Sequence, residues 1–125
     1  MHIDPTSEQA QSFGATAERP EPVFMLNLLR FKEGDGTESY ARYTAAASEH
    51  LARVGGAILW AGACDEALIG PAAREWDAVA VVRYPSRAAF LEMVRDPGYQ
   101  SIVGHRTAGL ADSRLIPCAE APLGS

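Results

Sequence analysis

The chain has 125 residues, of which 47% are hydrophobic and 22% charged, a composition typical of one globular domain with a single core. The formal net charge of −5 argues against a nucleic-acid partner, because proteins that bind nucleic acids usually carry a basic stripe. No apolar run approaches the ~18 residues of a membrane-spanning helix, and the first twenty residues lack the apolar block of a secretory signal. The two cysteines are too few for a disulfide framework, so we expect reduced thiols and a cytoplasmic protein.

The elements are expected in the order βαββαβ. Apolar and β-branched runs predict four strands, over residues 23–31, 57–63, 77–84 and 113–118. Apolar residues at helical spacing predict one helix from the Gly34–Gly36 turn to about Val54, a second that Ser86 caps, and a short helical piece over 98–110. A long connection over 64–76 separates the second and third strands, and it suggests a protruding hairpin.

The segments outside these elements define the expected domain boundaries. Residues 1–21 are rich in polar residues and are followed by proline, which favours a flexible N-terminal arm draped over the domain. The domain itself is expected over 22–119, and 120–125 form a C-terminal tail.

This order of elements is typical of the ferredoxin-like fold, an α+β fold in which both helices cover one face of a four-stranded antiparallel sheet. The first and third strands are the most apolar and should be central, whereas Pro117 implies that the last strand lies at an edge. The strand over 23–31 is apolar on both faces, so the face without helices also needs cover. The simplest solution is a homodimer that packs sheet against sheet.

Four blocks of the chain resemble the DUF1330 family: MLNLLRFK, YARYTAAASEHLARVGG, WDAVAVVRYPSRAAFLEMVRDPGYQ and HRTAGLADSRLI. The resemblance spans about residues 23–118, and the YPSRAAF…M…DPGYQ segment is its most specific part. It implies a ferredoxin-like protomer that dimerises through its sheet into the dimeric α/β barrel. That superfamily also holds cofactor-independent monooxygenases, muconolactone isomerases, haem enzymes and stress-responsive proteins, so the fold alone does not define a reaction.

Two residues are the candidates for catalysis. Asn27 is a lone amide within the apolar strand over 23–31, where asparagine is depleted and costly to bury without partners. Either backbone groups of the core satisfy it, or it points into a pocket between sheet and helices and donates to a ligand oxygen. His105 follows the second helix and is either a helix-terminal residue or the general base of a reaction.

Five further residues are candidates for substrate binding, because each is a charged or aromatic group that could line such a pocket: Arg83, Arg106, Tyr43, His50 and Trp60. Arg83 could hold an anionic substrate bidentately, with a structural salt bridge as the alternative, and Arg106 could bind a carboxylate, with a surface position as the alternative. Tyr43 and His50 lie on or beside the buried stripe of the first helix, where a core role is the alternative. Trp60 either walls the pocket or packs across the hairpin.

Several chemistries lack a motif. The chain has no GxSxG elbow, no GxGxxG after a strand and no Walker loop, and neither the cysteines nor His50 and His105 show metal-binding spacing, so no metal or cofactor is expected. The first hypothesis is a cofactor-independent enzyme that acts on a small organic acid, lactone or aromatic metabolite, with His105 and Asn27 facing one closed cavity. The second is a non-catalytic dimer that binds a small ligand or serves in assembly. A third makes His105 a haem ligand.

Overall fold

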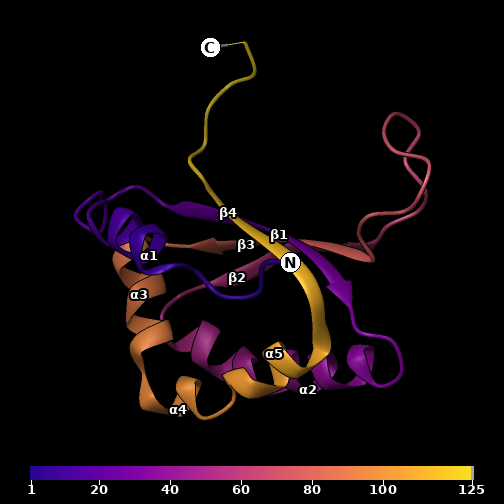
Figure 1. Ribbon diagram of the computed structural model, residues 1–125. Coiled ribbons are helices and arrows are strands. Elements are labelled where there is room, and N and C mark those ends of the chain that lie inside the picture. The colour runs from indigo at the N-terminus through magenta and orange to yellow at the C-terminus, as the bar shows by residue number, and fades with distance from the viewer. Residues whose placement is uncertain (125) are drawn as a thin grey trace.

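The computed structural model, which describes residues 1–124, shows a four-stranded antiparallel sheet with helices packed on one face (Figure 1). The strands are β1 (Val23–Phe31), β2 (Ala57–Ala63), β3 (Ala78–Tyr84) and β4 (Leu110–Cys118). The helices are α1 (Ser7–Gly14), α2 (Gly36–Arg53), α3 (Arg87–Arg95), α4 (Pro97–Gln100) and α5 (Val103–Gly109). The strand order β2-β3-β1-β4 confirms the α+β ferredoxin-like fold and places Pro117 on an edge strand, as predicted.

The core lies between the sheet and the helix layer. Val23, Met25 and Leu29 of β1 alternate along the strand and are buried on the same face. Tyr84 of β3 pairs with Val23 and joins the same cluster, together with Met93 of α3. The alternation in β1 therefore decides which face the helices cover.

The opposite face of the sheet is mostly apolar and is uncovered within the described chain. Its central part is half-buried and is formed by alternating residues of β1 and their partners on β3: Phe24, Leu26, Leu28, Val79 and Val81. On the flanking strands, Trp60 is 60% exposed and Ile116 is 43% exposed. Ile116 pairs with Leu26, and Trp60 pairs with Val81, so both belong to this open face.

Helix α1 was not predicted from the sequence, which suggested only a flexible arm in this region. It begins at a capping box, in which the Thr6 hydroxyl accepts from the Gln9 backbone and the Gln9 side chain accepts from the Thr6 backbone. At its end, Phe13 packs edge-to-face on Phe90 of α3, with ring centroids 5.4 Å apart. The Thr-x-x-Gln spacing was the available signal, but one large apolar residue gives this short helix little apolar periodicity.

Residues 64–77 form the long β2–β3 connection that the sequence predicted, and they project away from the body of the domain (Figure 1). Leu68 and Ile69 are almost fully exposed on it. At its base, the Cys64 backbone N–H donates to the Asp77 carbonyl at 2.9 Å, which closes the connection onto the sheet.

Helices α2 and α5 meet backbone to backbone. A Cβ added to Gly109 would lie 2.7 Å from the Gly36 carbonyl oxygen and 2.9 Å from the Tyr40 backbone nitrogen. Only glycine at this crossing allows the two helices to approach so closely. The crossing fixes the position of α5, and β4 follows it directly from Leu110, three residues earlier than predicted.

Candidate functional site

A largely buried arginine lies in the helix layer that covers one face of the sheet. Arg106 lies on α5, about one turn before the Gly109 crossing, so its side chain is carried against α2. Only 14% of the side chain is exposed. Its Nη1 donates to the Ile3 carbonyl oxygen at 2.7 Å. The carboxylate that it meets is Asp4, whose Oδ1 is 3.9 Å from Nη1 and whose side chain is 68% exposed. The guanidinium therefore has a weak counter-charge and unused donors.

Three tyrosines form a phenol cluster beside Arg106. The Tyr43 hydroxyl of α2 and the Tyr99 hydroxyl of α4 are 2.6 Å apart and share a hydrogen bond. Tyr40, one turn before Tyr43, packs on it with ring centroids 5.4 Å apart. Burial raises the pKa of Tyr40 and of Tyr43, and the positive charge of Arg106 opposes this rise in both. At neutral pH these phenols are thus uncharged and can donate hydrogen bonds to an anion.

His50 extends this cluster toward the surface. Its ring lies edge-on to Tyr99, with centroids 6.2 Å apart, and the residue is buried. Arg53 Nη1 approaches His50 Nδ1 at 3.5 Å, and because arginine only donates, Nδ1 is the acceptor of this contact. These edge-to-face ring contacts connect His50 through Tyr99 to Tyr43.

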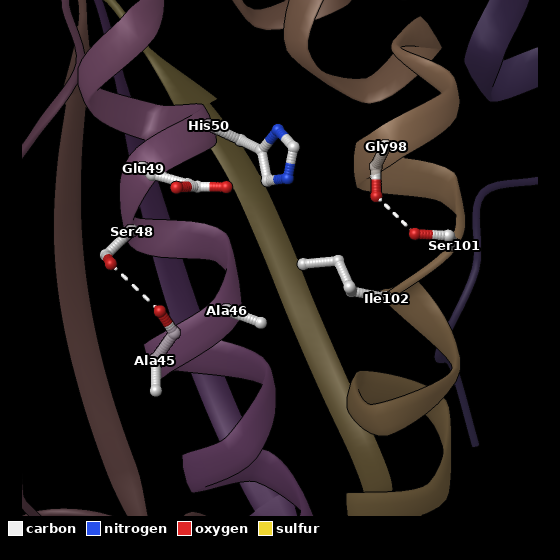
Figure 2. Close-up of a pocket in the computed structure, with 8 residues that line it drawn as sticks. All are labelled: Ala45, Ala46, Ser48, Glu49, His50, Gly98, Ser101 and Ile102. Atoms are coloured by element: carbon white, nitrogen blue, oxygen red, sulfur yellow. Dashed lines mark hydrogen bonds between the residues drawn. The ribbon is translucent and has the colours of Figure 1, made fainter.

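His50 also lines an open crevice of about 540 Å³ between α2 and the α4–α5 segment. Figure 2 shows its imidazole and the side chain of Ile102 entering this space from opposite walls. A Cβ on Gly98 would lie 3.0 Å from His50 Cε1, so glycine leaves room for the ring. The Ser101 hydroxyl donates to the Gly98 carbonyl at 2.6 Å, which closes the turn on that side.

Asn27 lies on the helix-covered face of β1, since it alternates with buried Met25 and Leu29. Its neighbours across the sheet are Ala80 on β3 and Leu115 on β4. The side chain is half-buried, and its Nδ2 donates to the Met25 carbonyl oxygen at 3.2 Å. The amide therefore has the backbone partner that the first alternative for Asn27 expected, and Asn27 is not among the residues that line the crevice beside His50.

The remaining candidates lie apart from this cluster. His105 is exposed on α5, although the enzyme hypothesis required it to face a closed cavity with Asn27. Arg83 pairs with Phe24 and Trp60 with Val81, so both lie on the open face of the sheet. The helix side thus brings together Arg106, Tyr43 and His50, whereas it does not include Arg83, Trp60 or an inward-facing His105.

Two parts of the cluster were not found from the sequence. Tyr99 was seen only as one letter of the DPGYQ segment, although a tyrosine in the most family-specific stretch was a usable signal. The contact of Ile3 with Arg106 joins residues 103 positions apart, and no local pattern predicts such a pair.

The ferredoxin-like sheet and helix layer define the class of protein, and sequence comparison gives the family. A family model described as "Domain of unknown function (DUF1330)" matches residues 28–117. The chain belongs to this family, as the resemblance indicated. A solved protein of unknown function from Rhodopseudomonas palustris is 42% identical, with a TM-score of 0.89 over 97% of this chain and 98% of that one.

More distant solved structures share the fold alone. A dimeric ferredoxin-like protein of unknown function from Thermobifida fusca is 18% identical, with a TM-score of 0.57 over 82% of this chain and 93% of its own. The hydroxynitrile lyase from Passiflora edulis is 15% identical, with a TM-score of 0.60 over 82% and 95% of the two chains. No curated protein matches the chain.

Two general features of the described chain bear on partners. Across residues 1–124, no helix is both long and apolar enough to cross a membrane. Over the same range, no three histidine, cysteine, aspartate or glutamate side chains gather in a group that could hold a metal ion.

Proposed function

We propose that this protein binds a small organic acid between its helix layer and its sheet, with the carboxylate held by Arg106. The observation that carries the proposal is the guanidinium itself, because only 14% of its side chain is exposed while its carboxylate partner, Asp4, is 68% exposed and lies 3.9 Å from Nη1. A buried cation is costly unless it is paired and hydrogen-bonded. A carboxylate matches the guanidinium fork with two parallel hydrogen bonds, so a ligand of this class would supply a closer counter-charge than Asp4 does.

The neighbouring groups suit the rest of such a ligand. The phenols of Tyr40 and Tyr43 are neutral donors for a second oxygen, and their rings offer an apolar wall. Asn27 is a further neutral amide on the same side of the sheet. This combination of one cation, neutral donors and aromatic surface favours a compact aromatic or unsaturated acid over a purely apolar metabolite.

We propose cofactor-independent enzyme activity on this acid, with His50 as the proton-transferring group in place of His105. His50 is buried against Tyr99, which is hydrogen-bonded to Tyr43 beside Arg106. Histidine titrates near neutral pH and therefore suits general acid–base work. The alternative is a protein that binds the acid without converting it.

The open face of the sheet supports a homodimer as the working form. Exposed Trp60 and Ile116 flank half-buried Leu26 and Val81, so the apolar surface is continuous across the strands. Such a surface in a single chain usually marks an interface. A second copy packed face to face would bury it with twofold symmetry.

Matched ligand pairs test the binding proposal. Benzoate and benzamide have similar shape, but only benzoate carries a negative charge, so benzoate should bind and raise the melting temperature while benzamide should not. Arg106→Gln should weaken benzoate binding by about 10- to 100-fold, the equivalent of losing a charge-assisted pair. Arg42→Gln is the control, because Arg42 is an exposed arginine of α2 paired with Glu38 at 3.1 Å. Equal benzoate affinity in the two variants would refute the proposal.

The choice between enzyme and binding protein needs a separate measurement. A panel of small carboxylic acids is incubated with the protein and then analysed by NMR for conversion. Conversion of any acid that binds, lost in His50→Gln and retained in His105→Gln, would support the enzyme. Unchanged recovery of every bound acid would favour the binding protein.

A further inference from the structure

The first residues of the chain lie across the Arg106 site as a short strap, here residues 2–4. Figure 1 shows the indigo segment running from α1 to the N-terminal end, which lies beside β4. The His2 backbone N–H donates to Asp112 Oδ1 at 2.8 Å, and the Ser113 hydroxyl donates to the His2 carbonyl at 2.7 Å. The third attachment is the bond from Arg106 to the Ile3 carbonyl at 2.7 Å.

These attachments are polar and few. His2 and Asp4 are exposed, and only Ile3 is half-buried. The strap donates or accepts three hydrogen bonds but adds almost no apolar packing to the core. Segments of this kind belong to the least stable parts of a fold and open without global unfolding.

The strap uses the donor that a ligand would need. The Ile3 carbonyl oxygen occupies a hydrogen-bonding position at Arg106 Nη1, and Asp4 stands 3.9 Å from the same nitrogen. A neutral carbonyl makes one bond there, whereas a carboxylate makes two charge-assisted bonds to a guanidinium. The two cannot use Nη1 fully at the same time.

We propose that residues 2–4 are a displaceable strap that closes the Arg106 site in the empty protein and is released when a ligand carboxylate takes the place of the Ile3 carbonyl. This inference rests on the proposed function and adds its regulation. The strap reduces the apparent affinity for an acid because each binding event must first break its contact with Arg106. The hydrogen bonds that hold His2 on β4 therefore also weaken ligand binding at Arg106 on α5.

The test follows the side-chain Nε–H signal of Arg106 by NMR during titration with acetate and with benzoate. Three chains are compared with the unaltered protein: one lacking residues 2–5, which keeps the Thr6 cap of α1, Ser113→Ala, and Ser12→Ala. Ser113→Ala removes one attachment of His2, and Ser12→Ala is the control at an exposed serine of α1. We expect about tenfold tighter binding in the shortened chain, about threefold in Ser113→Ala and no change in Ser12→Ala.

The outcomes separate the two proposals. If both acids shift the Arg106 signal with the same affinity in all four chains, the strap is not coupled to the site and only the inference is overturned. If neither acid shifts the signal in any chain, including the shortened one, the proposed carboxylate site is wrong and the inference falls with it. A faster amide exchange of residues 2–4 on saturation with benzoate is the positive sign of release.

Discussion

Replacing Gly109 by alanine should push α5 away from α2 and disturb Arg106 without touching it. The added Cβ would lie 2.7 Å from the Gly36 carbonyl oxygen, whereas ordinary contacts begin at 3.4 Å, so α5 must retreat by about 0.7 Å. The obstacle is backbone, which has no rotamer to change. Gly109 has no positive φ, so the substitution tests this close approach and not backbone strain.

The expected cost can be set against the gain in helix propensity. Overpacking of this kind costs about 1–3 kcal/mol. Alanine regains up to about 1 kcal/mol in a helix, and less at its final residue, so a net loss of about 1–2 kcal/mol remains. Urea unfolding monitored by circular dichroism measures this free energy directly.

Gly104 of the same helix is the matched control. No atom lies within 4 Å of a Cβ added there, so Gly104→Ala should be neutral or stabilise the protein by up to about 1 kcal/mol. Gly109→Ala should also weaken benzoate binding, because Arg106 moves with α5. If Gly109→Ala proves as stable as Gly104→Ala, the glycine crossing does not position this helix and the account of the site is wrong.

Three further predictions concern separate features. Tyr43→Phe should cost about 1–3 kcal/mol by leaving the buried Tyr99 hydroxyl without its partner, and the double change to Phe should cost less than the sum, as a double-mutant cycle of urea unfolding would show. The His2 backbone N–H, together with hydrogen bonds from neighbouring residues, lowers the pKa of Asp112 to about 2. The bond from His2 to the carboxylate should therefore be present above about pH 4 and be lost as the pH falls toward 2. Carbon-13 NMR of the carboxyl measures the pKa, and amide exchange of His2 measures the loss of the bond. Val81→Lys should place a charge in the middle of the open sheet face and convert the expected dimer into a monomer by light scattering.

Each of these has an outcome that contradicts it. A Tyr43→Phe protein as stable as the parent would show that the hydrogen bond between the Tyr43 and Tyr99 hydroxyls does not stabilise the fold. A His2 amide that stays protected in Asp112→Asn would show that the carboxylate does not hold the strap. Ala88→Lys, at an exposed position of α3, is the control for Val81→Lys, and the same mass for both variants would count against the sheet interface.

Local patterns predicted most of the fold. The expected bounds of the strands at 23–31 and 57–63 agree with β1 and β2, because apolar runs flanked by glycine or proline are a short-range signal. Ser86 caps α3 as predicted, accepting from the Ala89 backbone at 3.1 Å. The alternation along β1 also indicated that both faces of the sheet needed cover. By contrast, α1 has a cap but little apolar periodicity, and it was missed.

The sequence predicted which residues form the candidate site better than it predicted how they are arranged in space. Arg106, Tyr43 and His50 were selected because charged and aromatic groups beside a buried stripe suit ligand binding, and they do lie on one side of the sheet. The choice of His105 over His50 followed its loop-like sequence context. On α5, however, adjacent residues point in different directions, so a largely buried Arg106 leaves its neighbour His105 exposed.

The apolar periodicity and the turn and capping residues along the chain were enough to determine the strands, the main helices and the two-sided apolar character of the sheet, because these depend on neighbours a few residues apart. Only the tertiary structure decided that a glycine crossing carries Arg106 against the tyrosines and that Ile3 lies over it. These contacts join segments from opposite ends of the chain, and their geometry comes from how the helices pack, which is not encoded in any single stretch of sequence.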